Sequence, residues 1–248
     1  MRSFFSALVA IALSAVPAAA QTPTLKPFAT VNFGYQAHSQ DLTQRGEFSL
    51  YDETGNFEAQ HAIDGGPFFE IGGGVELTRK WAVGVSFAMR SKATRDVQVT
   101  ANVPSPIFTD TFRAASATVA DFEHTERAVH LQAMWNVPVT VEFDVTLFAG
   151  PSFFTVKDDL IESVTPTEVG GDFSQVNLDT IGRSRQSNTA VGFNLGVDGR
   201  YMLMRNVGVG GMLRYTRGQV DLTSPTGGED FKLDTGGLEI AGGLRLRF

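Results

Sequence analysis

Residues 239–248 read EIAGGLRLRF, and in this stretch apolar and polar side chains alternate. One phase holds Leu238, Ile240, Leu244, Leu246 and Phe248, whereas the other holds Glu239, Ala241, Gly243, Arg245 and Arg247. A period of two is that of a β-strand with one apolar face and one polar face. Because the terminal residues of a soluble domain are usually polar and frayed, an amphipathic strand that runs to a final phenylalanine is unusual for such a domain.

The first twenty residues, MRSFFSALVAIALSAVPAAA, are typical of a secretory signal peptide. Arg2 supplies the positive charge, residues 4–16 the apolar segment, and residues 18–20 a cleavage site of small residues. The apolar segment is shorter than the roughly 20 residues that a transmembrane helix needs. We therefore expect residues 1–20 to be a cleaved signal peptide and residues 21–248 to form one domain.

Composition excludes several classes of function. The chain contains no cysteine, so it has neither disulfides nor thiolate metal sites. Its net charge of −7 lacks the basic footprint of a nucleic-acid-binding protein, and we expect no nucleic-acid partner.

Period-two alternation recurs in eight runs, which cover residues 29–38, 68–77, 81–90, 128–137, 141–156, 191–201, 207–215 and 238–248. The fifth run is the least regular, because Phe148 and Phe154 fall in its polar phase. The connections alternate in length: TRK, PVT and LMRN are short, whereas roughly 39–67, 91–127, 157–189 and 217–234 are long and polar. Part of this length, such as residues 96–103, is expected to extend strands. The pattern predicts an all-β fold, an eight-stranded antiparallel up-and-down transmembrane β-barrel with short periplasmic turns and four long extracellular loops.

The two faces of the strands differ in a way that predicts which one faces lipid. The polar phase carries five acidic and five basic residues: Glu70, Glu76, Asp144, Asp198 and Glu239, and Arg90, Arg200, Arg214, Arg245 and Arg247. Equal numbers of both signs suit a closed interior, where buried charges must be paired. Most strand glycines share this phase, which makes room for large side chains in a narrow lumen. We predict that these ten residues form a lumen charge network.

Aromatic residues of the apolar phase lie near the strand ends. Trp81, Trp135 and Tyr201 are beside the short turns, whereas Tyr35, Phe153 and Tyr215 are nearer the long connections. This placement predicts two aromatic girdles around a hydrocarbon-facing band. An open sheet would leave unpaired amides in lipid, so the strands should close.

The signal peptide, the eight strands, the sorted connections and the terminal LRLRF resemble the small outer-membrane barrels of Gram-negative bacteria, of the OmpA, OmpX and OmpW type. The resemblance implies an outer-membrane location and contact with membrane lipid and lipopolysaccharide. It also implies that Leu244, Leu246 and Phe248 form the signal that the barrel-assembly machinery reads. An exposed apolar edge strand is physically suited to such pairing. We expect a monomer.

Candidate chemistry is sparse, and we predict no catalytic, cofactor-binding or metal site. His124 and His130 share a phase but would stand about 20 Å apart, too far for a common metal. The sequence RQSNTA at 185–190 resembles the His-x-Ser-Asn of outer-membrane lipid A deacylases, but Arg185 replaces the histidine and leaves Ser187 without a base. Acidic residues in the long connections could bridge divalent cations to lipopolysaccharide, although solubility alone explains them.

Two functions remain open. The first is a non-enzymatic outer-membrane protein with a structural or surface-interaction role. The alternative is a narrow channel or a carrier of small or hydrophobic molecules. Eight strands leave no aqueous channel unless side chains move, so conduction would require the charged pairs of the lumen to switch partners.

Overall fold

The computed structural model describes residues 25–90, 93–171, 173–222 and 231–248, and the predicted signal peptide lies outside them. Nine strands account for most of this chain: β1 (Lys26–Leu50), β2 (Glu53–Glu76), β3 (Trp81–Arg90), β4 (Ala93–Pro104), β5 (Phe112–Pro138), β6 (Phe143–Val169), β7 (Gln175–Met202), β8 (Val207–Leu222) and β9 (Phe231–Arg247). Within the described residues no helix is long and apolar enough to cross a membrane.

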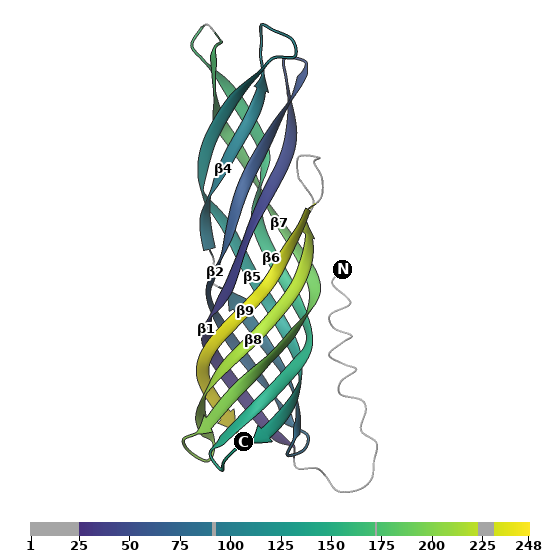
Figure 1. Cartoon of the computed structure of the whole chain (residues 1–248), viewed down its shortest axis with the longest axis vertical. Coiled ribbons are helices and arrows are strands. Elements are labelled where there is room, and N and C mark those ends of the chain that lie inside the picture. Colours follow the sequence, from purple (N-terminus) through teal and green to yellow (C-terminus); the bar gives the residue numbers. More distant parts are fainter. Residues whose placement is uncertain (1–24, 91–92, 172, 223–230) are drawn as a thin grey trace.

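The strands form one antiparallel sheet that closes on itself (Figure 1). β1 pairs with β2 on one side and with β9 on the other, and consecutive strands pair around the rest of the ring. β3 and β4 both lie between β2 and β5, one above the other, so nine strands occupy eight positions. The prediction of an all-β, eight-stranded up-and-down barrel is therefore confirmed.

Three tight turns, at residues 77–80, 139–142 and 203–206, connect strands at the end where the C-terminus lies (Figure 1). Each turn is closed by backbone hydrogen bonds to the first residue of the next strand. In two turns a threonine hydroxyl also accepts a hydrogen bond from that residue, Thr78 from Trp81 and Thr140 from Phe143. These connections are the short turns that the sequence predicts, and we call this the short-turn end.

At the other end most residues of the long connections lie in strands. β1 and β2 remain paired up to Leu50 and Glu53, and β6 and β7 up to Val169 and Gln175. By contrast, β9 leaves β1 after Ala37. Six strand positions, those of β1, β2, β4, β5, β6 and β7, thus continue past the ring as a tall structure that we call the extension, which comprises residues 39–64, 93–123 and 159–185 (Figure 1).

The extension consists of two sheets. β1, β2, β4 and β5 form one sheet, and the β6–β7 hairpin forms the other, because β5 and β6 stop pairing above His124 and Asp158. Gln44 joins the two sheets, since its side-chain amide bonds both the carbonyl and the amide of Ile161, at 2.6 and 3.0 Å. This reciprocal pair satisfies backbone groups that no neighbouring strand reaches.

Polarity is opposite in the two halves of the molecule. Inside the extension, apolar side chains from β2, β4, β5, β6 and β7 form one core, against which Phe48 and Leu50 of β1 pack: Phe57, Ala59, Val97, Val99, Ala101, Val103, Ala115, Phe122, Ile161, Val164, Val176 and Leu178. In the ring below, large apolar side chains instead lie on the outer surface, and charged side chains fill the interior. The ring thus has the exterior of a membrane protein, whereas the extension has the interior of a water-soluble one.

Phe148 and Phe154, the residues that made the fifth run irregular, point into the ring and are buried. Phe148 packs with Phe68, Ala88, Met212 and Ala241. Glycine provides the space: a methyl group on Gly196 would lie 2.6 Å from the ring of Phe148. Lumen glycines therefore accommodate aromatic side chains as well as the charged ones that we expected.

Candidate functional site

The interior of the ring is built in layers, and the first lies at the short-turn end. Arg200 is 2.8 Å from Asp144 and 3.7 Å from Glu76, while Arg247 is 2.9 Å from Asp144 and 3.3 Å from Glu76. Each guanidinium thus contacts both carboxylates. The four residues come from β2, β6, β7 and β9, so this layer joins strands around the ring.

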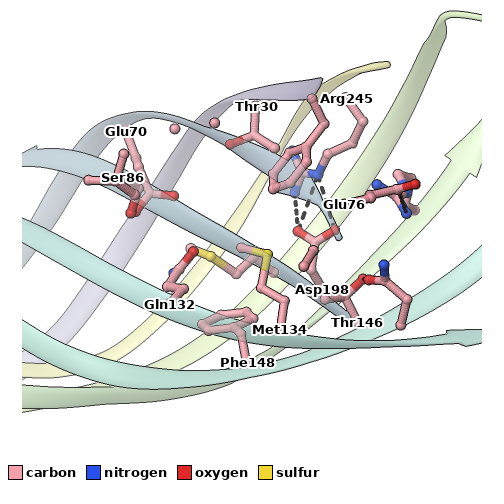
Figure 2. A pocket seen from close by; sticks show the side chains of 18 residues that line it. Thr30, Glu70, Glu76, Ser86, Gln132, Met134, Thr146, Phe148, Asp198 and Arg245 are labelled. Atoms are coloured by element: carbon pink, nitrogen blue, oxygen red, sulfur yellow. Dashed lines mark hydrogen bonds and ion pairs between the residues drawn. The ribbon is translucent and has the colours of Figure 1, made fainter. Parts of the chain in front are cut away.

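Arg245 and Asp198 form the second layer, where they make a bidentate ion pair. Arg245 also donates a hydrogen bond of 2.6 Å to Asn32. A cavity of about 50 Å³ lies beside this pair. Figure 2 shows Asp198 and Arg245 joined across one side of it, with Gln132, Met134 and Phe148 along another. The cavity has room for a few water molecules at most.

Arg214 forms the third layer and is the most enclosed charge of the ring. Its side chain is fully buried between Glu70 and Glu239, and it makes ion pairs with both. Asn32 and Ser86 donate hydrogen bonds to Glu70, at 2.9 and 3.0 Å. The two carboxylates and the guanidinium are therefore held by several strands, the geometry that a buried charge requires.

Arg90, the tenth residue of the predicted network, is not joined to the other nine. Its guanidinium is buried, and its ion-pair partner is Glu126, at 3.8 Å. Glu126 also accepts hydrogen bonds from Gln36, at 3.4 Å, and from the backbone of Gly236, at 3.2 Å. The structure thus brings nine predicted residues together in three layers and places Arg90 with a carboxylate that the sequence reading did not include.

A second group that the sequence reading missed lies above Arg90, at the base of the extension. Asp158 is fully buried, bonded to Arg95 at 2.7 Å and 3.5 Å from His124. Arg95 also contacts the imidazole of His61, at 3.2 Å. Burial, followed by the positive charge of Arg95, lowers the pKa of His61 to about 4. These residues face inward from strand segments that the sequence predicts as loops. Without a strand assignment, the sequence does not show that their side chains point toward one another.

The two groups considered for chemistry differ in environment, since one is enclosed in the ring and the other includes the exposed Ser187. His130 lies 2.7 Å from the hydroxyl of Ser152, but both are fully buried inside the ring. Asn188, beside Ser187 in RQSNTA, donates to the carbonyl of Asp221 at 2.7 Å. Among the residues that the structure describes, no group of three or more His, Asp or Glu side chains could hold a metal ion.

The predicted girdle and assembly residues lie on the outer surface. The six aromatic side chains of the girdle are exposed there: Tyr35, Trp81, Trp135, Phe153, Tyr201 and Tyr215. Leu244 and Phe248 are also exposed, and Leu246 is half-buried. All three lie at the end of the strand that closes the ring, where the amide of Phe248 donates to the carbonyl of Pro27 at 3.0 Å.

A closed ring with an apolar exterior and a charged interior is typical of an outer-membrane barrel, and the family model of the outer membrane protein β-barrel domain matches residues 6–248. The chain belongs to this family. Membership places the barrel in the outer membrane of Gram-negative bacteria, with the short turns at the periplasmic end. No curated protein is significantly similar in sequence.

Solved structures of other outer-membrane barrels are similar to this chain. OprG of Pseudomonas aeruginosa is 12% identical, with 90% of this chain and 96% of that chain covered and a TM-score of 0.44. Neisserial surface protein A is 13% identical over 90% and 97% of the chains, with a TM-score of 0.39. The protease OmpT of Escherichia coli is 10% identical over 93% and 99%, with a TM-score of 0.45.

Proposed function

We propose that this protein is a closed, non-enzymatic outer-membrane barrel that holds a rigid β-structured extension outside the cell for contact with other molecules. The observation that carries the proposal is the continuity of the strands. β1, β2, β5, β6 and β7 run without interruption from the barrel into the extension, whose two sheets share an apolar core. A cored extension has the rigidity that a binding platform needs, which a set of flexible loops lacks.

The filled interior supports a closed barrel over a channel or carrier. The layer around Arg214 joins β8 to β2 and β9, the layer around Arg245 joins β9 to β7, and Phe68, Phe148 and Met212 pack together inside the ring. Beyond the barrel, the apolar core fills the space between the two sheets of the extension. A permeating ion would have to displace several buried ion pairs, each of which is costly to break.

A non-enzymatic role is supported by the placement of the reactive side chains. The imidazole and hydroxyl that lie within hydrogen-bond distance, His130 and Ser152, are enclosed by the barrel wall. A nucleophile needs a base, but it also needs access to its substrate. Ser187 is exposed, but RQSNTA gives it no base, because Arg185 stands in the place of the histidine and is paired with Glu123 and Asp159.

The test is conductance, measured on the refolded protein in planar bilayers. We expect a heat-modifiable band on unboiled gels, which reports a folded barrel, together with silence in single-channel recordings. Discrete conductance steps from the wild-type protein would contradict the proposal and favour the channel.

Surface contact is tested with a trimmed variant, in which residues 40–63, 94–123 and 160–184 are each replaced by an Asn-Gly turn. These replacements join the paired residues Ser39 and Asp64, Ala93 and His124, and Asp159 and Arg185. Cells that display the full chain should adhere to protein-coated surfaces more than cells with the trimmed variant. Equal adhesion at equal amounts of folded barrel would remove the surface role.

A further inference from the structure

The far end of the extension carries an exposed apolar patch, which we call the tip patch. It lies on the three hairpin turns at the top of Figure 1 and consists of Tyr51, Ile107, Phe108, Phe112, Val169 and Phe173. Phe108 is 65% exposed and Ile107 57%. Contiguous exposed apolar residues with an aromatic majority mark interaction sites in soluble structures.

Hydrogen bonds tie the three turns into one unit. Arg113 makes a bidentate pair with Glu168 and donates to the backbone carbonyls of Pro104 and Phe173, at 2.8 and 2.9 Å. Tyr51 donates to Glu168 at 2.9 Å. The hydrogen bonds from Arg113 lower the pKa of Glu168, so this carboxylate stays ionised. The tip patch is therefore preorganised, and ordering it on binding costs little.

The membrane of the same cell does not explain the tip patch. Between the tip patch and the lipid-facing band, β1 continues from Ser39 to Leu50, twelve residues that span about 40 Å at the rise of a strand. Over this distance the outer face is polar, with Thr43, Arg45 and Glu47 exposed on β1. The apolar residues of the tip patch thus form a second surface, separate from the band that contacts lipid.

Charge around the tip patch selects the partner. Asp52, Glu53, Asp110 and Glu168 lie on or beside the three turns, whereas Arg113 is the basic residue that the structure describes there. Four acidic groups and one basic group give a net charge of −3. An acidic rim around an apolar centre is complementary to a basic rim around an apolar centre, and it repels anionic surfaces.

We propose that the tip patch is a docking site for a protein surface or segment with a basic rim and an apolar, aromatic centre. This inference rests on the proposed surface-contact function and names the partner chemistry for it. Apolar contact from Phe108 and its neighbours supplies affinity, while the acidic rim supplies orientation and faster association.

The experiment uses the full chain in phosphatidylcholine nanodiscs. The probe is a fluorescent twelve-residue peptide of alternating arginine and tryptophan, with alternating Glu-Trp and Arg-Ser peptides as controls. Binding to empty nanodiscs is subtracted. We expect the Arg-Trp peptide to bind, binding to weaken with salt, and the Glu-Trp and Arg-Ser peptides to bind at least tenfold more weakly.

Two variants of the tip patch test which of its residues bind the peptide. The apolar variant Ile107→Ser/Phe108→Ser/Phe112→Ser should reduce affinity at least tenfold. The charge variant Asp52→Asn/Asp110→Asn should reduce it severalfold and flatten the salt dependence; both positions have positive φ, 62° and 57°, which asparagine tolerates. Glu162→Gln, an exposed acidic residue on the side of the extension, is the matched control and should change nothing.

The outcomes separate this inference from the function on which it rests. Equal affinity of the wild type and the apolar variant, with loss in the trimmed variant, overturns the tip site but keeps the extension as a binding surface. If the trimmed variant binds the peptide as tightly as the wild type, both the tip site and the extension as a binding surface are overturned for this class of ligand. Binding of the tip to phosphatidylcholine vesicles in place of the peptide, lost in the apolar variant, overturns the protein partner in favour of a lipid one.

Discussion

Arg214 shows how much the stability of the barrel can depend on a single buried side chain. Its side chain is 0% exposed, and its two carboxylate partners would be left buried without a cation if it were removed. We expect Arg214→Gln to lower the free energy of unfolding by about 3–5 kcal/mol.

The matched control for this substitution lies three residues further along β8. Arg217 is 59% exposed and pairs with Asp234, itself 40% exposed, at 3.6 Å. Arg217→Gln should change the free energy of unfolding by about 1 kcal/mol or less, because exposed pairs are screened. Urea unfolding from detergent micelles measures both variants, and similar losses would show that burial does not set the strength of these pairs.

His61 makes the extension sensitive to pH. Burial holds its pKa near 4, whereas the ordinary value is 6.5, so the unfolded chain binds a proton below pH 6.5 that the folded chain does not. Stability from this residue is therefore complete above pH 6.5, falls as the pH drops, and is lost near pH 4. The difference corresponds to about 3 kcal/mol.

Amide hydrogen exchange in β2 and β4, corrected for intrinsic rates, measures this effect between pH 7 and pH 5. Protection should fall in the wild type and stay nearly constant in His61→Gln, whose side chain does not titrate. The same loss of protection in both proteins would assign the effect to another group.

At the scale of the strand, glycine determines how closely β1 and β9 approach at the seam where the ring closes. A methyl group on Gly243 would lie 1.8 Å from the carbonyl oxygen of Val31, whereas a methyl group on Gly242 would meet its nearest atom at 3.7 Å. We expect Gly243→Ala to lower the free energy of unfolding by about 3 kcal/mol and Gly242→Ala by about 0.5 kcal/mol or less.

Urea unfolding, with the heat-modifiable band as the readout, tests this adjacent pair. A Gly243→Ala barrel as stable as the wild type would show that the seam can widen without cost.

The sequence predicts the ring well because membrane strands have an uninterrupted outer phase. In β3, for example, Val83, Val85, Phe87 and Met89 share one face, and the predicted run ends at Arg90, as the strand does. Residues 96–103 are predicted as strand and lie in β4, but most of the extension reads as loop in the sequence because its outer phase is polar and its inner phase includes small or polar side chains. In β2 that inner phase is Phe57, Ala59, His61 and Ile63, and such a mixture has weak hydrophobic contrast.

The candidate site could be predicted as a set of residues but not as a set of pairs. Period-two spacing shows that Glu70, Arg214 and Glu239 share the interior phase. Which carboxylate meets which guanidinium depends on the stagger between strands far apart in sequence, and the sequence alone does not give that stagger. For the same reason Arg90 was grouped with residues that it does not contact, and Glu126 was left out.

At the scale of the molecule, the level at which the outer surface changes from apolar to polar sets how deep the barrel lies in lipid. Tyr35 and Tyr215 lie at this level, and above them the exposed residues include Arg127 and Arg217. Inside, the change runs the other way, from ion pairs to an apolar core. Lipid surrounds the lower part of these strands and water surrounds the upper part. At the membrane surface the outward-facing side chains therefore change from apolar to polar, and the inward-facing side chains change from charged to apolar.

The continuity of β1, β2, β5, β6 and β7 has a mechanical consequence. Because these strands continue unbroken from the barrel into the extension, a tensile force on the tip runs along the strands into the barrel wall. Such a force loads the interstrand hydrogen bonds in shear, many at once, and does not peel them apart one by one. A load on the far end of the extension is thus borne by the bilayer-embedded part of the protein.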